Sequence, residues 1–272
     1  MKELVTRSIW GFFFAASLTG AILIGSYTFA ALFLVLSVFV LWEFYSLCHK
    51  AGYSPQIYPG LVVGSLIFLF SYLVAEDYFP AKAFLYLLPL IYASFVYELY
   101  RNKKNPLVNI ALTLLGIVYV TIPFSILNFL AFPPSHDGPI YSNVIIISLF
   151  LFVWAGDSGA YLFGVRFGKH RLFERISPKK SWEGLLGGIV TALLIAWILT
   201  YVYQYSFIVL GLLAIVVVIS GTLGDLIESM FKRSIGVKDS GKFMPGHGGL
   251  LDRFDSILLA SPAIYFLLQF FN

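Results

Sequence analysis

The sequence predicts an all-α fold: a polytopic membrane bundle of about nine transmembrane helices. The 272-residue chain is 59% hydrophobic and only 12% charged, and its mean hydropathy is +0.87. A water-soluble domain of this size could not cover its surface with so few polar groups. The apolar residues also form long runs separated by charged or Pro/Gly-bearing breaks, and a helix needs about 20 such residues to cross a bilayer.

Nine apolar runs are the predicted spans. The first follows Lys2 and Arg7 and could mimic a signal peptide, but another apolar run begins at once, so we interpret it as a retained span. Alternatively, the sixth extends through Asp157 and Tyr161 as one helix that faces the bundle interior. The runs cover residues 9–25, 27–48, 58–74, 81–99, 107–131, 140–154, 184–203, 207–223 and 256–271.

Short linkers favour one integral membrane domain over residues 1–272. Within it, the spans in 1–135 are less informative, whereas 140–272 holds the predicted catalytic spans and cytoplasmic loops. Every lysine and arginine except Lys82 lies in the N-terminus or in a break after an even-numbered span. The positive-inside tendency therefore predicts a cytoplasmic N-terminus. The few cations among the spans argue against nucleic acid as a partner.

Asp157 lies within or at the end of the sixth apolar run, beside Ser158 and Gly159. A carboxylate in such a place costs about 2.5–3.5 kcal/mol on insertion scales unless it is paired or hydrated. We interpret Asp157 as a site acid. An interhelical hydrogen bond or ion pair is the alternative.

Lys179 and Lys180 come just before the span at 184–203. Two lysines at a helix N-terminus concentrate positive potential and suit a polyphosphate. Lysines beside a cytoplasmic span end are also common for topological reasons alone. Both interpretations stay open on the residues themselves.

The end of the eighth run carries acids and bases at helical spacing. Asp225 and Ser229 are four residues apart and share one helix face, while Glu228 and Lys232 share an adjacent face. Lys232 and Arg233 could neutralise the two acids. Alternatively, the acids could hold a metal ion.

Segment 229–255, SMFKRSIGVKDSGKFMPGHGGLLDRFD, is polar in an otherwise apolar chain. Asp252 and Asp255 are three residues apart, so on one helical turn their carboxylates point the same way. Carboxylate, water and phosphate oxygens together make a Mg²⁺ site. The segment therefore predicts phosphate or nucleotide chemistry.

Glycines and a histidine stand beside these acids. Gly248 and Gly249 allow a close backbone approach to a ligand. His247 could bind phosphate or transfer a proton, and a structural hydrogen bond is the alternative. Arg253 lies between the two acids in sequence and could simply neutralise them.

Glu43 and Glu98 lie near the predicted cytoplasmic ends of two spans and are weaker candidates. Glu98 precedes Arg101 by three residues. We expect Glu98 to pair with Arg101 or to reach water.

Segment 229–255 resembles the signature of the phosphatidate cytidylyltransferases, also called CDP-diacylglycerol synthases. The spacing matches throughout, and Met244, where Leu, Ile or Phe is usual, is one soft departure. Stretches 157–161, 177–184 and 224–229 are similar to that family too, so the close resemblance covers roughly the C-terminal 120 residues. The matched signature residues are Ser229, Lys232, Arg233, Lys238, Asp239, Gly241, Pro245, His247, Gly248, Gly249, Asp252, Arg253 and Asp255.

The resemblance implies the reaction CTP + phosphatidate → CDP-diacylglycerol + pyrophosphate. It implies a Mg²⁺-dependent in-line attack of the lipid phosphate on the α-phosphorus of CTP, with K⁺ as a candidate second ion. The implied metal ligands are Asp225, Asp252 and Asp255. The implied catalytic residues are Asp225, Lys232, Arg233, Lys238, Asp239, His247, Asp252 and Asp255. The implied substrate-binding residues are Asp157, Ser177, Lys179, Lys180, Ser229, Gly248, Gly249 and Arg253.

The implied partners are CTP, phosphatidate and the lipid bilayer, with a homodimer as a candidate oligomeric state. The implied location is the cytoplasmic membrane, with the active site facing the cytoplasm. A CTP-dependent lipid kinase or a cytidylyltransferase of another lipid phosphate is the alternative. A transporter is a remote alternative, because the charges cluster at one face instead of the midplane.

Overall fold

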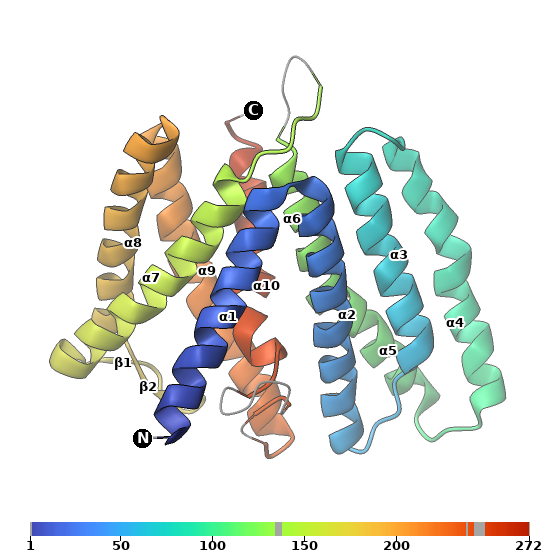
Figure 1. The fold of residues 1–272 in the computed structure, drawn as a ribbon. Helices are drawn as coiled ribbons and strands as arrows, with labels where there is room; N and C mark the ends of the chain where they lie inside the picture. The colour runs from blue at the N-terminus through green and yellow to red at the C-terminus, as the bar shows by residue number, and fades with distance from the viewer. Residues whose placement is uncertain (1, 134–137, 238, 242–247, 272) are drawn as a thin grey trace. The chain divides into compact units, whose positions relative to one another are not determined.

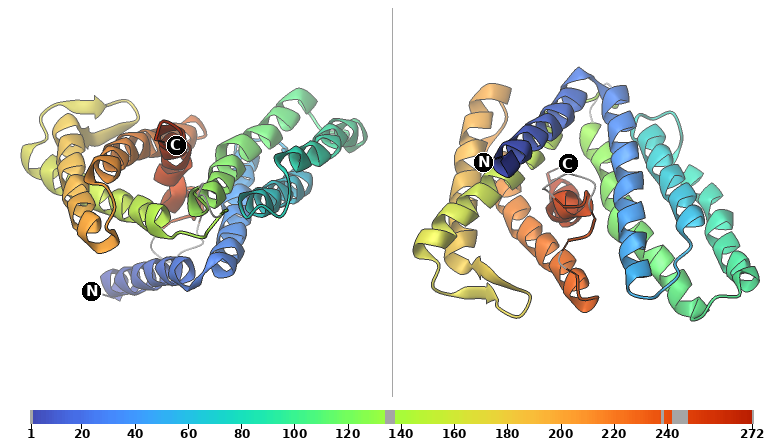
Figure 2. Two further views of the ribbon diagram at one scale, coloured as in Figure 1. Left: turned by 90° about the horizontal axis from the view of Figure 1, so that it is seen from above. Right: turned by 60° about the horizontal axis from the view of Figure 1, so that its bottom comes forward.

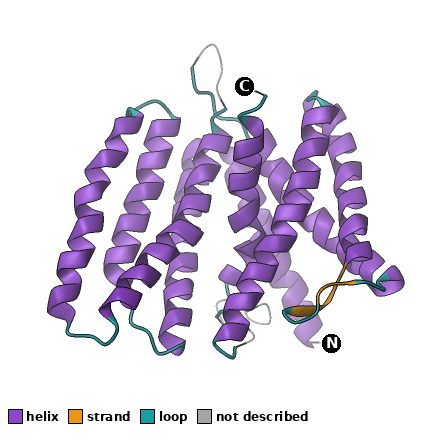
Figure 3. Cartoon of the chain, turned by 180° about the vertical axis from the view of Figure 1, so that it is seen from behind, coloured by secondary structure: helices purple, strands orange, loops and turns teal. Residues whose placement is uncertain are grey.

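A computed structural model of the chain describes residues 2–133, 138–237, 239–241 and 248–271 (Figure 1). These residues are mostly helical, and a short antiparallel strand pair is the only sheet that they form (Figure 3). The all-α prediction is therefore confirmed. Contacts divide the chain into two compact units: Met1–Tyr141 with Ile235–Phe254, and Ser142–Ser234 with Asp255–Asn272.

The first unit contains the N-terminal helices. A π-helical turn, η2, joins α5 to α6, so the three form one continuous apolar segment. Pro123 follows this turn and cannot donate a backbone hydrogen bond, which accounts for the locally wider winding. The elements are α1 (Lys2–Ile24), α2 (Ser26–Lys50), α3 (Ile57–Ala75), η1 (Ala81–Leu87), α4 (Leu88–Arg101), α5 (Pro106–Gly116), η2 (Ile117–Thr121) and α6 (Ile122–Ala131).

The second unit contains three long helices and the strand pair, which connects α7 to α8 (Figure 2). Helix α10 begins in the first unit and continues into the second. The elements are α7 (Val144–Phe167), β1 (Arg171–Phe173), β2 (Ser177–Ser181), α8 (Trp182–Tyr203), α9 (Phe207–Ser234) and α10 (Leu251–Leu268).

Seven helical segments in the described chain are long and apolar enough to cross a membrane. The multi-span prediction is thus confirmed, while the count of nine and the orientation stay predictions. Helix α7 extends to Phe167, which confirms the longer boundary for the sixth run. The seven segments are Ser26–Lys50, Ile57–Ala75, Ala81–Arg101, Pro106–Ala131, Val144–Phe167, Trp182–Tyr203 and Phe207–Ser234.

A buried polar network ties α4 to its neighbours in the first unit. Glu98 is 5% exposed, and its carboxylate accepts hydrogen bonds from Arg101 Nη1 at 2.8 Å, Asn109 Nδ2 at 2.9 Å and Gln56 Nε2 at 2.7 Å. The predicted pairing of Glu98 with Arg101 is therefore confirmed. Three donors compensate the loss of hydration that burial of this carboxylate entails.

Small residues let α7 and α8 pack closely in the second unit. A Cβ atom on Gly159 would overlap Thr191 Oγ1 and the carbonyl oxygen of Gly187. Thr191 also crosses the interface, because its hydroxyl donates to the carbonyl oxygen of Ala155 at 2.9 Å. Such contacts between small residues stabilise helix pairs within membranes. They fix the helix that carries Asp157 beside the helix that follows the two lysines.

Replacing Gly159 by alanine is expected to destabilise this helix pair. Overpacking of a close contact costs about 1–3 kcal/mol, equivalent to a fall in Tm of roughly 3–10 °C for a chain of this size. Thermal unfolding of the detergent-purified protein measures the change. Gly20→Ala in α1 is the matched control, because a Cβ there meets nothing within 4 Å. An equal Tm for the two variants would contradict the proposed tight interface.

Candidate active site

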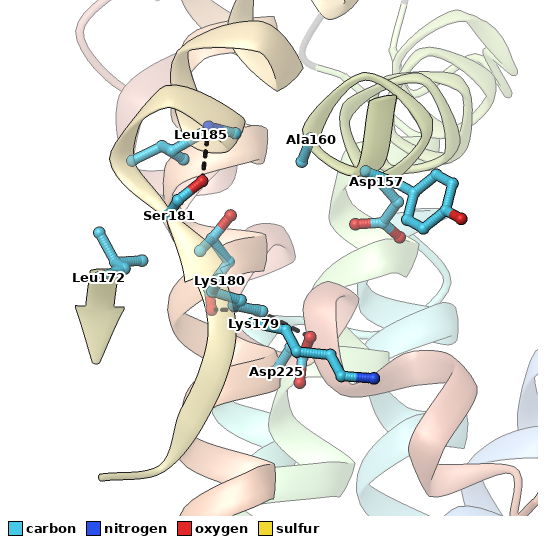
Figure 4. Close-up of a pocket in the computed structure, with 11 residues that line it drawn as sticks. Asp157, Ala160, Leu172, Lys179, Lys180, Ser181, Leu185 and Asp225 are labelled. Atoms are coloured by element: carbon cyan, nitrogen blue, oxygen red, sulfur yellow. Dashed lines mark hydrogen bonds and ion pairs between the residues drawn. The ribbon is translucent and has the colours of Figure 1, made fainter. Parts of the chain in front are cut away.

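A pocket of about 310 Å³ lies in the second unit, bordered by α7, β2, α8 and α9 (Figure 4). Four polar residues that the sequence singled out line it: Asp157 on α7, Lys179 and Lys180 on β2, and Asp225 on α9. Residues that are 68 positions apart thus meet at one cavity. Sequence similarity grouped these residues, and the packing of the three helices brings them together.

Lys180 links the basic and acidic sides of this pocket. Its Nζ lies 2.7 Å from Asp225 Oδ2 and donates a hydrogen bond to the carbonyl oxygen of Thr222 at 3.1 Å. The lysine side chain is 24% exposed and the aspartate side chain 38% exposed, so both can reach a ligand that enters. An ammonium group held in this way offers positive charge to a phosphate.

The strand pair positions the two lysines. Arg171 is paired with Ser181, and Phe173 with Ser177, so Lys179 and Lys180 lie on the returning strand. Ser181 then caps α8: its hydroxyl accepts a hydrogen bond from the amide of Gly184 at 3.1 Å. A serine at this position satisfies one of the unpaired amides of a helix start. The lysines are therefore fixed directly before a helix N-terminus, where the helix dipole also favours anions.

Glu183, in the first turn of α8, binds the residues that directly precede β1. Its carboxylate accepts the backbone amides of Lys169 at 3.1 Å and His170 at 3.2 Å, and His170 Nδ1 lies 2.6 Å from Glu183 Oε1. The amide of Trp182 donates to the carbonyl oxygen of His170 at 3.0 Å. These bonds anchor the hairpin at its base, so the backbone that bears Lys180 is restrained on both sides.

A cluster of three carboxylates stands next to the pocket. Ligand atoms of Asp225, Glu228 and Asp255 lie within 4.8 Å of one another. Asp225 and Glu228 are three residues apart on α9, whereas Asp255 comes from α10. The two helices approach closely at Gly224, where a Cβ would overlap the carbonyl oxygen of Asp255. Oxygen ligands that converge in this way suit a hard divalent cation.

Side chains on α9 complete this cluster. Ser229 Oγ donates to Asp225 Oδ1 at 3.1 Å, and Lys232 forms an ion pair with the buried carboxylate of Glu228. Helical spacing predicted that each pair shares a helix face, and the contacts confirm this. Arg233, next along the helix, is exposed.

The central part of the signature segment, Ile235–Phe254, belongs to the first unit and has a separate set of contacts. Asp252 accepts the amide of Gly249 at 2.8 Å and the amide of Ser240 at 3.1 Å. Gly248 has a φ of +84°, a left-handed conformation that favours glycine, and a Cβ there would also press on Asp252 Oδ2. The Asp252 carboxylate thus links Ser240 to Gly249 within the signature segment.

Comparison with known proteins agrees with this geometry. A sequence model described as the cytidylyltransferase family matches residues 5–271. The chain belongs to the cytidylyltransferase family. It is 37% identical over 215 residues to a protein of Staphylococcus aureus (strain COL) named phosphatidate cytidylyltransferase, covering 77% of this chain and 79% of that protein.

Other relatives of the chain are also named phosphatidate cytidylyltransferase. One from Haemophilus influenzae is 43% identical over 168 residues, which cover 59% of this chain and 57% of the relative. Another, from Staphylococcus haemolyticus, is 40% identical over 184 residues, covering 66% and 68%. The chain is therefore a nucleotidyltransferase enzyme, and its apolar helices make it a multi-pass membrane protein.

The remaining predicted site residues lie outside the pocket and the carboxylate cluster, or outside the described residues. Lys238 and His247 lie outside the described residues. Asp239 and Arg253 are exposed, and Ser177 begins β2. The family resemblance implied Asp225, Asp252 and Asp255 as the metal ligands, whereas the structure groups Glu228 with Asp225 and Asp255. Helical spacing had offered Asp225 and Glu228 as possible holders of a metal ion, as the alternative to neutralisation by Lys232 and Arg233.

Proposed function

We propose that this enzyme transfers the cytidylyl group of CTP to phosphatidate, forming CDP-diacylglycerol and pyrophosphate. The observation that carries the proposal is the pocket in which Lys180 meets Asp225 beside two further carboxylates. Both substrates bear phosphates, and the reaction requires that their negative charges approach each other. The printed names of the relatives support phosphatidate as the acceptor.

The two lysines are proposed to bind the phosphates of CTP. Lys180 is partly buried and already placed by Asp225 and Thr222, so little side-chain freedom is lost when a phosphate binds. Lys179 lines the same pocket and is more exposed. Their positive charges would stabilise the negative charge that develops on the departing pyrophosphate.

The carboxylate cluster fits a Mg²⁺ ion. Three acids within 4.8 Å of one another repel when ionised, and a divalent cation relieves that repulsion. Asp225, Glu228 and Asp255 would hold the ion, which supplies charge neutralisation to the phosphates. We retain Asp252 as a ligand implied by the family resemblance, and K⁺ as a second ion.

The proposed transfer is a single in-line displacement. An oxygen of the lipid phosphate forms a bond to the α-phosphorus of CTP. The bond from that phosphorus to the oxygen bridging to the β-phosphorus breaks, and pyrophosphate leaves with the electron pair. No covalent enzyme intermediate is needed, so the chain's task is to position two anions and to neutralise their charge.

We also propose that the pocket faces the cytoplasm, where CTP and Mg²⁺ are available. The bias of lysine and arginine toward one set of breaks supports this orientation. Cysteine-accessibility labelling of Lys169→Cys and Lys82→Cys in intact and permeabilised cells tests it, after replacement of Cys48 by alanine. We expect Lys82→Cys to be labelled in intact cells and Lys169→Cys only after permeabilisation. The opposite pattern would contradict the proposal.

The direct test of function uses purified protein with phosphatidate, CTP and Mg²⁺. We expect pyrophosphate release equal to the amount of CDP-lipid formed, and loss of both on chelation of the metal. Release of CDP with a phosphorylated lipid would instead identify a lipid kinase. Turnover with another lipid phosphate but not with phosphatidate would revise the acceptor. A folded protein that forms no product with any nucleotide would contradict the assignment.

A further inference from the structure

Glu43 is a buried acid on α2 that neither the pocket nor the carboxylate cluster includes. Its side chain is 3% exposed, and its Oε2 accepts the backbone amide of Leu251 at 2.8 Å. Leu251 is the first residue of α10, so this carboxylate caps a helix that begins 208 residues further along the chain. A carboxylate at a helix N-terminus satisfies an otherwise unpaired amide and interacts favourably with the helix dipole.

The same carboxylate also contacts the beginning of the signature segment. Ser240 Oγ donates to Glu43 Oε2 at 3.3 Å. Gly241 and Gly249 lie so close that a Cβ on either would overlap the Glu43 carboxylate. Glu43 therefore touches the segment on both sides of residues 242–247.

All the polar groups of Ser240 are bonded. Its hydroxyl donates to Glu43, its amide donates to Asp252 at 3.1 Å, and its carbonyl oxygen accepts Lys50 Nζ at 3.2 Å. Lys50 is two helical turns beyond Glu43 on the same helix α2. Ser240 is 1% exposed, so this fully bonded residue joins α2 to Asp252.

We propose that Glu43 is a positioning residue for the nucleotidyl transfer. Its hydrogen bond from the Leu251 amide fixes the start of α10. Its hydrogen bond from the Ser240 hydroxyl fixes the residue whose backbone amide donates to Asp252. It thereby sets the orientation of the Asp252 carboxylate without touching substrate. The inference rests on the proposed function, and it adds a residue that lies outside the signature motif.

The test compares Glu43→Gln with Glu98→Gln in the full-length protein. Both positions are buried acids in polar networks of the same unit, but the Glu98 network contains no residue of the signature segment. We expect Glu43→Gln to lower kcat per folded enzyme by about 10–100-fold, the range found when supports of a ligating carboxylate are lost. Glu98→Gln should lower Tm but change kcat less than about two-fold, since it alters stability alone.

Amide hydrogen exchange gives a readout independent of catalysis. In Glu43→Gln, the peptide covering 248–252 should exchange faster than in wild type, whereas in Glu98→Gln it should not. Ser240→Ala should also lower kcat. The effects of Ser240→Ala and Glu43→Gln should be less than additive, because both changes remove the hydrogen bond from the Ser240 hydroxyl to Glu43. Ser240→Ala also carries the test if Glu43→Gln fails to accumulate.

The inference would be overturned if folded Glu43→Gln kept the wild-type kcat. Where Glu43→Gln is not obtained, a wild-type kcat in Ser240→Ala would overturn it. So would an unchanged exchange rate at 248–252. A wild-type protein that forms no CDP-lipid would instead refute the proposed function. The hydrogen-exchange rates at 248–252 would then still decide whether Glu43 restrains this part of the signature segment.

Discussion

Replacing Asp225 by asparagine is expected to lower kcat/KM for CTP by about 10³-fold. The change removes a carboxylate that lies in the cluster with Glu228 and Asp255 and that also holds Lys180 at 2.7 Å. A metal ion contributes several kcal/mol to stabilisation of transition-state charge, and about 4 kcal/mol corresponds to a factor of 10³. Pyrophosphate release at varied Mg²⁺ measures both the loss and a rise in the Mg²⁺ concentration for half-maximal rate.

Asp77→Asn is the matched control for this experiment. Asp77 is exposed in the first unit and has a φ of +61°, a left-handed conformation that asparagine also tolerates. We expect its kcat/KM to stay within about two-fold of wild type, as for surface substitutions generally. Near-normal turnover and an unchanged Mg²⁺ dependence in Asp225→Asn would remove this residue from the metal site.

Local spacing predicted the contacts that lie within one helix. Asp225 and Ser229, and likewise Glu228 and Lys232, were predicted to share a helix face, and both pairs are in contact. Glu98 was expected to pair with Arg101 or to reach water, and it pairs with Arg101. Helical periodicity alone places such side chains on one face. The apolar runs likewise predicted the helices, because each run must be long enough to cross the bilayer.

Residue spacing alone does not predict contacts between distant segments. Asp255 joins Asp225 because α9 and α10 approach at Gly224, and a glycine in a sequence does not reveal which backbone it will face. Glu43 was assigned only to a span end, whereas it caps a helix that starts at Leu251. Family resemblance identified the residues of the signature, but it carries no information on a supporting acid that lies outside the motif.

Replacing Lys180 by glutamine is expected to lower kcat/KM for CTP by about 10²-fold. Hydrogen bonds to charged groups contribute about 1.5–3 kcal/mol, and the upper part of that range corresponds to such a factor. Lys180 is more buried than Lys179, so its charge acts through a medium less screened by water. Lys179→Gln should therefore have a smaller effect. Lys82→Gln, an exposed lysine of η1, is the matched control and should leave turnover unchanged.

The Mg²⁺ dependence of Lys180→Gln separates the two roles that its geometry permits. If the lysine binds CTP phosphates, KM for CTP rises and the half-maximal Mg²⁺ concentration stays near that of wild type. If it only restrains Asp225 through the 2.7 Å ion pair, the variant instead shows the Mg²⁺ defect of Asp225→Asn in weaker form, with KM for CTP little changed. We expect the first pattern, because Lys180 lines the pocket and keeps 24% of its side chain exposed to an entering ligand. The second pattern would make Lys180 a support of the metal site and leave nucleotide binding to Lys179 and other cations.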